Sequence, residues 1–214
     1  MIYRTNPCKH EGERVLLVEG IHDCHVVLAL REAHRVTKDF GLYECGGEDG
    51  VLRRANALIP SSTPPTVVGL VVDADKPDLS GRWQSVRDKL SRHGYVFPAQ
   101  PSDGGTILEE SNGLPRLGIW LMPNNRDTGM LEDFCFELAA PHSREFAERC
   151  VDDARNAGAT TFQSVHYRKA VVYTYLAWQD KPGLPLGQAV TRQSLSPEIP
   201  IAREFTTWLA RLFA

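Results

Sequence analysis

Two continuous apolar runs in the first third of the chain each end at an acidic residue. The run at 15–18 ends at Glu19, and the run at 67–72 ends at Asp73, which Asp75 follows two residues later. Unbroken aliphatic and β-branched runs are typical of strands buried on both faces of a parallel sheet. The ligand crevice of such sheets lies at the carboxyl ends of the strands. We therefore expect these three acids to gather at one edge of a sheet.

Helical periodicity alternates with strand-like runs through the first two thirds of the chain, which predicts an α/β fold with a mainly parallel sheet flanked by helices. On the segment 79–93, helical spacing buries Trp83 and Val86 and exposes Arg82. The expected strands are 14–18, 40–45, 67–72, 95–98 and 117–123, and the expected helices are 21–35, 51–59, 79–93 and 130–139.

The pattern changes at Pro141, after which helices are expected at 143–157, 167–179 and 201–213. We predict an α/β domain over residues 12–140 and a helical C-terminal extension over 141–214 that packs on it. The aromatic residues of the second of these helices are predicted to be core residues, because they lie on a strongly apolar segment. They are Tyr173, Tyr175 and Trp178.

Composition and charge indicate a globular protein. Hydrophobic residues make up 42% of the chain and charged residues 24%, and the formal net charge is −3. This balance argues against a protein that holds nucleic acid mainly through a bulk positive field. It leaves nucleic acid open as a substrate, since bound metal would offset part of a negative site.

The five cysteines form no CxxC pair and are odd in number. We therefore expect reduced thiols in a cytoplasmic protein rather than a disulfide framework or a zinc ribbon. The sequence shows neither a secretory signal nor an apolar segment of membrane-spanning length, so we expect a soluble protein without a membrane partner.

Clustered carboxylates at a sheet edge predict a site for Mg²⁺ or Mn²⁺, with one or two ions. Two cations about 3.5–4 Å apart can activate water and stabilise the attacking and leaving oxygens of a phosphoryl transfer. The alternative is that the acids are solvated strand ends or first-turn residues that stabilise helix starts. The candidate metal ligands are Glu19, Asp23, Asp73, Asp75, Glu132 and Asp133.

Three further residues are candidates for contact with a phosphate group. Lys76 directly follows the acid pair, and Gly46 and Gly47 precede an expected helix start, where backbone N–H groups bind anions. A solvated lysine and a plain tight turn are the competing interpretations.

A strand that ends in Glu-Gly, followed by a later strand that ends in Asp-x-Asp, resembles the signature of the TOPRIM domain of topoisomerases, bacterial primases and OLD-type nucleases. The matching residues are Glu19-Gly20 and Asp73-Ala74-Asp75. The resemblance implies a compact Rossmann-like sheet and catalytic roles for Glu19, Asp73 and Asp75. Over nearly its whole length the chain looks closest to small prokaryotic TOPRIM-like proteins described as a domain of unknown function, through segments 19–23, 122–125, 129–133 and 169–187.

Among TOPRIM proteins, the chain is most similar to the OLD-like nucleases, because it has room for neither a tyrosine-bearing topoisomerase domain nor primase zinc modules. The resemblance implies metal-dependent hydrolysis of phosphodiester bonds in DNA or RNA. OLD-type nucleases usually work with an ATPase, and the chain has no Walker motif. A separate ATPase is therefore an expected partner.

Two other interpretations stay open. The first is a non-catalytic or partner-dependent metal-binding component of a defence or toxin system. The second is a haloacid-dehalogenase-type phosphatase with Asp73 as nucleophile. In that second interpretation Glu19 has no role, and Pro77 stands where the motif usually continues with Thr or Val.

Overall fold

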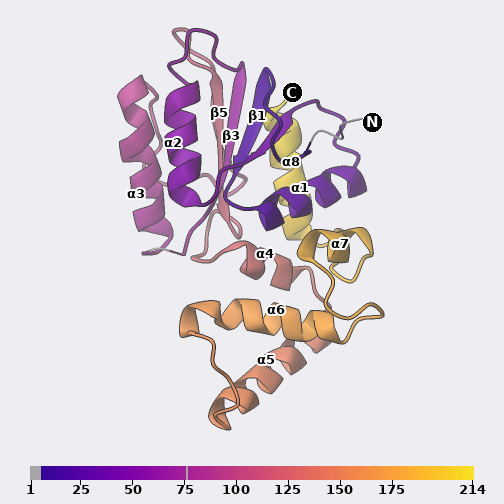
Figure 1. The fold of residues 1–214 in the computed structure, drawn as a ribbon. Coiled ribbons are helices and arrows are strands. Elements are labelled where there is room, and N and C mark those ends of the chain that lie inside the picture. Colours follow the sequence, from indigo (N-terminus) through magenta and orange to yellow (C-terminus); the bar gives the residue numbers. More distant parts are fainter. Residues whose placement is uncertain (1–5, 76) are drawn as a thin grey trace.

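The computed structural model describes residues 6–75 and 77–214. Strands and helices alternate up to α3, strands β4 and β5 follow one another before α4, and the rest of the chain is helical (Figure 1). The elements are β1 (Arg14–Val18), α1 (Ile21–Ala33), β2 (Gly41–Glu44), α2 (Glu48–Leu58), β3 (Val67–Asp73), α3 (Leu79–Leu90), η1 (Ser91–His93), β4 (Thr106–Leu108), β5 (Arg116–Met122), α4 (Leu131–Glu137), α5 (Pro141–Asn156), η2 (Ser164–His166), α6 (Tyr167–Ala177), α7 (Leu186–Thr191) and α8 (Pro200–Leu212).

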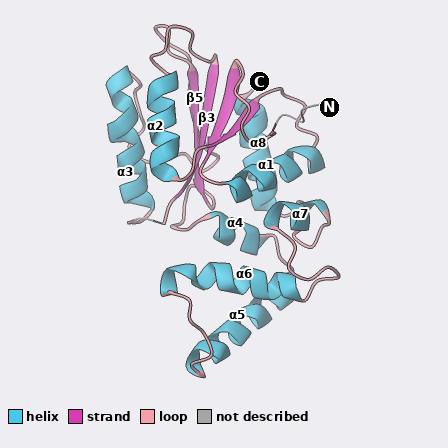
Figure 2. Ribbon diagram, in the orientation of Figure 1, coloured by secondary structure: helices cyan, strands magenta, loops and turns pink. Residues whose placement is uncertain are grey.

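The strands form one five-stranded sheet in the order β2-β1-β3-β5-β4. The pairs β1–β2, β1–β3 and β3–β5 are parallel, and the edge strand β4 pairs antiparallel with β5. Helices α2 and α3 cover one face and α1 and α8 cover the other (Figure 2). The predicted α/β fold class is confirmed, with β1 and β3 side by side near the middle of the sheet.

Alternation along the strands divides the core into two layers. Val15, Leu17 and Leu70 face α2 and α3, where they join Trp83 and Val86 in one buried cluster. Leu16, Val18, Val71 and Trp120 face the other side, in a cluster with residues of α1 and α8. Burial of both sheet faces explains why these strands read as continuous apolar runs.

A pair of glycines lets α8 approach the sheet closely. Gly69 of β3 and Gly118 of β5 are directly paired, and Leu212 of α8 lies over them. A Cβ atom at Gly118 would come 2.7 Å from Leu212 Cδ1, which is closer than carbon atoms pack. The two positions therefore require glycine for a packing reason.

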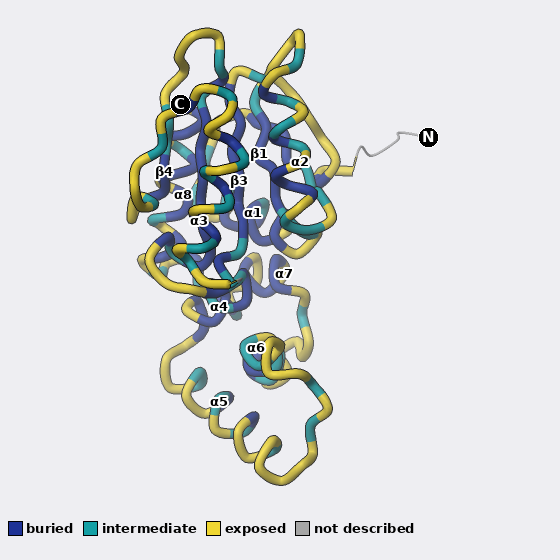
Figure 3. Tube along the Cα trace, turned by 90° about the vertical axis from the view of Figure 1, so that its left-hand side faces the viewer, coloured by how far each residue is buried: buried dark blue, intermediate teal, exposed yellow. Residues whose placement is uncertain are grey.

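The last third of the chain has two kinds of helix. Helices α5 and α6 form a hairpin below α4, beyond the carboxyl edge of the sheet, and much of α5 is exposed (Figures 1 and 3). Helix α7 packs against α1, and α8 returns to the sheet. Within the described residues, no helix combines the length and the apolar character needed to cross a bilayer.

Segment 95–98, which we expected to be a strand, is not one. Its apolar side chains pack on α3 instead of entering the sheet: Phe97 makes edge contacts with Trp83 and Tyr95, and Trp83 Nε1 donates a hydrogen bond to the Pro98 carbonyl at 3.3 Å. The edge strand is β4, which directly follows Gly104-Gly105. The short helix α7 was also not expected.

The prediction of reduced thiols is wrong for two of the five cysteines. Cys8 and Cys24 form a disulfide, and Cys45, Cys135 and Cys150 are free. The N-terminal segment runs antiparallel beside β2, where the Glu44 amide donates to the Cys8 carbonyl at 2.9 Å. This pairing places Cys8 against α1, a contact that sequence spacing does not indicate.

The core prediction for α6 is only partly right. Tyr175 is buried, and Tyr173 is half-buried. The Trp178 side chain is 45% exposed and packs against Phe146 of α5, with ring centroids 5.4 Å apart. Trp178 lies just past the last turn of α6, at the open edge of the hairpin.

Candidate metal centre

The two acids that end adjacent strands meet at the carboxyl edge of the sheet. Val18 of β1 pairs with Val71 of β3, so Glu19 leaves its strand beside the end of β3. The backbone N–H of Asp73 donates a hydrogen bond to Glu19 Oε1 at 2.9 Å. This contact fixes the Glu19 carboxylate next to the Asp73 backbone.

Asp23 joins these two acids from the first turn of α1. Its Oδ2 accepts a hydrogen bond from the Gly20 N–H at 3.0 Å, which caps the helix, and the residue is only 7% exposed. Burial, with a smaller contribution from the nearby Glu19 carboxylate, raises the pKa of Asp23 to about 7. An acid that serves only as a helix cap can remain solvated, whereas Asp23 is buried at a cost to its charged form.

Asp73 is the most strongly perturbed acid of the group. Its Oδ1 accepts a hydrogen bond from the Leu131 N–H at 3.0 Å, which ties the end of β3 to the first turn of α4. The pKa of Asp73 is raised to about 9. Burial is the largest cause, followed by the charges of Asp23 and Glu19 and then those of Asp75 and Glu132. The acids predicted from the strand ends therefore act on one another electrostatically.

Glu132 and Asp133 follow each other in α4 but have different surroundings. Glu132 is 8% exposed, and its Oε1 lies 3.5 Å from Nζ of Lys169, which extends from α6. Asp133 Oδ2 accepts the Met130 N–H at 2.9 Å, and its Oδ1 accepts from Arg168 Nε at 2.8 Å. Glu132 therefore belongs to the carboxylate group, whereas both oxygens of Asp133 serve a helix cap and an ion pair.

The Arg168 guanidinium links the outlying hairpin to α4. Besides Asp133, it binds Glu148 of α5 at 2.8 Å and lies 4.2 Å from the centre of the Phe136 ring. The hairpin is thereby held against the helix that carries Glu132.

Asp75 faces a buried arginine that we predicted to be exposed. The Arg82 side chain is only 3% exposed, and one of its terminal nitrogens lies 3.7 Å from Asp75 Oδ1. Its Nε donates to the Asp73 carbonyl at 2.7 Å, and it also forms an ion pair with Glu48. Burial lowers the pKa of Arg82, and the charge of Glu19 opposes that effect.

Sequence reasoning missed both Arg82 and Glu48. One signal was available, since Arg82 lies four positions before the buried Val86 and therefore on the same helix face. Burial of a charge on that face requires an acidic partner, and only the fold brings Glu48 of α2 to that place.

A buried thiol also lies near the acids. Cys135 of α4 is fully buried, and burial raises the pKa of its thiol well above the usual range, with further contributions from Glu132, Asp23 and Asp73. The thiol therefore remains protonated, and sequence reasoning did not connect it with the site.

The candidate phosphate contacts have separate outcomes. Gly47 is the N-cap of α2, with φ of 112°, and its N–H donates to the Glu19 carbonyl at 2.8 Å. Gly46 also has a positive φ, of 76°, so both glycines suit the turn between β2 and α2. Lys76 lies outside the described residues.

The donor chemistry of the group fits a hard divalent cation, because Glu19, Asp23, Asp73 and Glu132 offer only carboxylate oxygens. After burial, repulsion between the acids contributes to the raised pKa values of Asp23 and Asp73, and a cation would relieve that repulsion. In residues 6–75 and 77–214, no three His, Cys, Asp or Glu side chains already form a group that could hold a metal ion. Side-chain rotation would have to bring the oxygens together.

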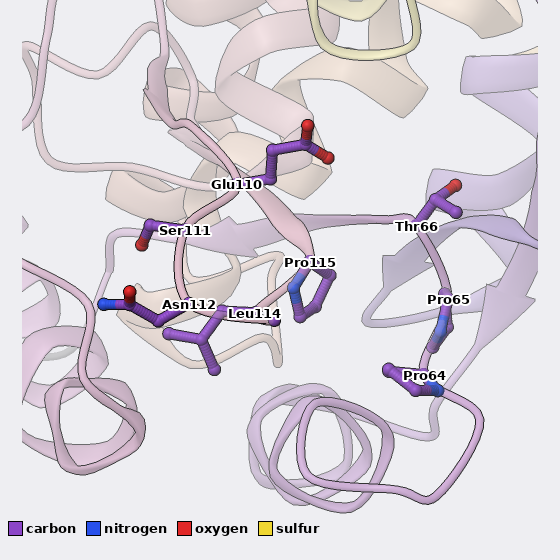
Figure 4. Close-up of a pocket in the computed structure, with 9 residues that line it drawn as sticks. Pro64, Pro65, Thr66, Glu110, Ser111, Asn112, Leu114 and Pro115 are labelled. Atoms are coloured by element: carbon purple, nitrogen blue, oxygen red, sulfur yellow. The ribbon is translucent and has the colours of Figure 1, made fainter.

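Two surface cavities lie outside the carboxylate group. One of about 430 Å³ is at the amino edge of the sheet, between Pro64-Pro65 and the loop that ends at Pro115, with Glu110 as its charged lining residue (Figure 4). Another, of about 500 Å³, borders Asp133 and Arg168. Neither contains the acids at the ends of β1 and β3.

Comparison with known proteins gives a family but no activity. No curated protein and no solved structure matches the chain. A family model described as "Protein of unknown function (DUF3226)" matches residues 13–214, a span that includes β1, α8 and every acid of the candidate centre. The chain therefore belongs to the DUF3226 family.

Proposed function

We propose that this protein hydrolyses phosphodiester bonds of DNA or RNA at a TOPRIM-like, OLD-like site that uses Mg²⁺ or Mn²⁺. The observation that carries the proposal is the hydrogen bond from the Asp73 amide to Glu19 Oε1 at the joined ends of β1 and β3. Asp23 and Glu132 extend the acid group from the first turns of α1 and α4. Carboxylates from adjacent strand ends and helix starts suit a phosphoryl-transfer centre.

Each side chain has a distinct task in this proposal. When bound, the divalent cation would activate a water molecule and stabilise the leaving oxygen. Asp23 and Asp73 bind the cation as carboxylates after losing the protons that burial favours. The Asp73 amide orients Glu19, whose carboxylate accepts the proton of the attacking water.

Lys169 supplies positive charge at the entrance. Its side chain is 47% exposed while its ammonium group lies 3.5 Å from Glu132. A phosphate that approaches the acids would otherwise meet only negative charge, so an accessible lysine favours its binding.

A specific observation also favours dependence on a partner. Asp75 and Glu132 are already paired with Arg82 and Lys169, and the described residues contain no preformed metal-holding group. A metal-binding component that becomes active only with a partner, such as a separate ATPase, would have these properties.

The test is cleavage of supercoiled plasmid, linear duplex, single-stranded DNA and RNA in the presence of Mg²⁺ or Mn²⁺. We expect metal-dependent cutting that is lost in Glu19→Ala and Asp73→Ala but kept in Asp153→Ala, a control on the exposed face of α5. Each variant is checked for a cooperative thermal transition. Equal cutting by the Asp73→Ala protein, or none by folded wild type with or without ATPase, would refute the proposed activity.

The assay is run with and without a thiol reductant. We also propose a cytoplasmic location, where the Cys8–Cys24 disulfide would be reduced. Cleavage that survives reduction of the disulfide would agree with both the proposed activity and the proposed cytoplasmic location.

A further inference from the structure

Arg82 is a buried cation beneath the carboxylate group. Its guanidinium is 3% exposed and contacts three acceptors: the Asp73 carbonyl at 2.7 Å, Asp75 Oδ1 at 3.7 Å and the Glu48 carboxylate. Burial of a charge is costly unless partners in fixed positions compensate it. The planar guanidinium fork suits this arrangement, because its donors point in set directions.

The three contacts of Arg82 connect separate parts of the carboxyl edge. Asp73 ends β3, Asp75 follows it in the loop, and Glu48 is the first residue of α2. The Arg82 side chain extends from the first turn of α3. One guanidinium therefore fixes the end of β3 relative to the starts of α2 and α3. It is too deeply buried to contact a substrate, and it is therefore a positioning residue.

The acids around Asp73 divide into two groups according to their partners. Glu19, Asp23 and Glu132 lie on the side of α1 and α4, whereas Asp75 and Glu48 face Arg82. In a two-cation centre, the second ion draws on carboxylates beyond those of the first. Here the carboxylates available for a second ion are already paired with a fixed positive charge.

We propose that Arg82 occupies the place of a second metal ion, so that the centre binds one divalent cation. The cation is held by Asp23 and Asp73, while Arg82 keeps Asp75 and Glu48 outside its coordination shell. This inference rests on the proposed metal centre and specifies its stoichiometry.

The test is the number of Mn²⁺ ions bound per chain, measured by isothermal titration calorimetry and by electron paramagnetic resonance of free Mn²⁺. We expect one ion in the wild type and in Arg82→Lys, which keeps the charge. In Arg82→Met we expect a second ion, since Asp75 and Glu48 become available. Arg87→Met is the matched control, because Arg87 lies on the same helix and donates to the Ala99 carbonyl, away from the acids, and it should still bind one ion.

The outcomes separate this inference from the proposed function. Two ions bound by the wild type would overturn the one-cation inference but would still support the metal centre. Because this count needs only the wild type, it tests the inference even if Arg82→Met fails to fold. A folded Arg82→Met protein that still binds only one ion would also overturn it, whatever the affinity, since Asp75 and Glu48 should then hold a second. Absence of Mn²⁺ binding in every variant would refute the metal centre itself.

Discussion

Replacement of Asp73 by asparagine should stabilise the protein at neutral and alkaline pH in the absence of metal. Asparagine keeps an oxygen that can accept the Leu131 N–H bond and removes the charge that burial and the neighbouring acids oppose. A metal site needs Asp73 as a carboxylate, but without metal the ionisation of this buried group costs free energy. Asparagine removes that cost, which is the source of the gain in stability.

The magnitude follows from the raised pKa of Asp73, about 9 in the fold compared with an ordinary value of 3.8. Below about pH 4 the group is protonated in both states and costs nothing. Above that pH the unfolded chain releases the proton while the fold retains it, so stability falls by about 1.4 kcal/mol per pH unit until the folded pKa is reached. At pH 7 this is about 4 kcal/mol as an upper value, so we expect a gain of about 2–4 kcal/mol from Asp73→Asn.

The assay is urea unfolding in a chelating buffer near pH 4, 7 and 9, with the free energy of unfolding from linear extrapolation. The difference between Asp73→Asn and wild type should be small near pH 4 and largest near pH 9. Asp153→Asn, on the exposed face of α5, should show no such trend. Added Mg²⁺ at about one hundred times its dissociation constant should stabilise the wild type by about 2.7 kcal/mol and the variant much less.

Two results would refute this reasoning. The first is a variant that is no more stable than wild type near pH 9, which would mean that the Asp73 carboxylate is not electrostatically costly. The second is a wild-type stability that does not decrease between about pH 5 and pH 9, since the raised pKa values of Asp23 and Asp73 both require a decrease in that interval.

Three further predictions concern other parts of the molecule. Cys8→Ser removes the disulfide to Cys24 and should lower the free energy of unfolding by about 3 kcal/mol; a melting temperature equal to that of oxidised wild type would contradict this. Gly118→Ala forces a Cβ against Leu212 and should cost about 1–3 kcal/mol in urea unfolding, whereas an unchanged value would show that α8 can shift freely. Lys169→Met should weaken binding of labelled single-stranded DNA by roughly tenfold in fluorescence anisotropy while Mn²⁺ still binds, and unchanged DNA affinity would exclude a phosphate contact.

The central strands could be predicted from sequence because burial on both faces leaves an unbroken apolar run. The expected strands at 14–18 and 67–72 correspond to β1 and β3, and their neighbouring positions bring Glu19 and Asp73 into contact. Parallel strands share one carboxyl edge, which is why acids that follow two such strands were expected to lie together. The apolar runs and the general topology of parallel sheets were therefore sufficient to predict that Glu19 and Asp73 meet.

Features that depend on a distant partner could not be predicted. Arg82 was assigned to the surface because arginine is rarely buried, and its burial depends on Glu48, which is far away in the sequence. The Cys8–Cys24 disulfide depends on an N-terminal segment that pairs beside β2. Segment 95–98 has the composition of a strand, but packing of Phe97 on Trp83 keeps it out of the sheet.

Burial distinguishes the acids of the candidate site from ordinary helix caps. Asp78 caps α3 by accepting the Gly81 N–H at 2.8 Å, and Asp133 caps α4 while it binds Arg168. Those local roles account for both residues. Glu132 is 8% exposed without capping α4, and Asp73 is held at a strand end among acids that raise its pKa to about 9. Glu132 pairs with Lys169, and Asp73 accepts the Leu131 N–H, but neither contact accounts for several buried acids gathered at one strand edge. This uncompensated burial of charge is the reason why we propose a bound cation there.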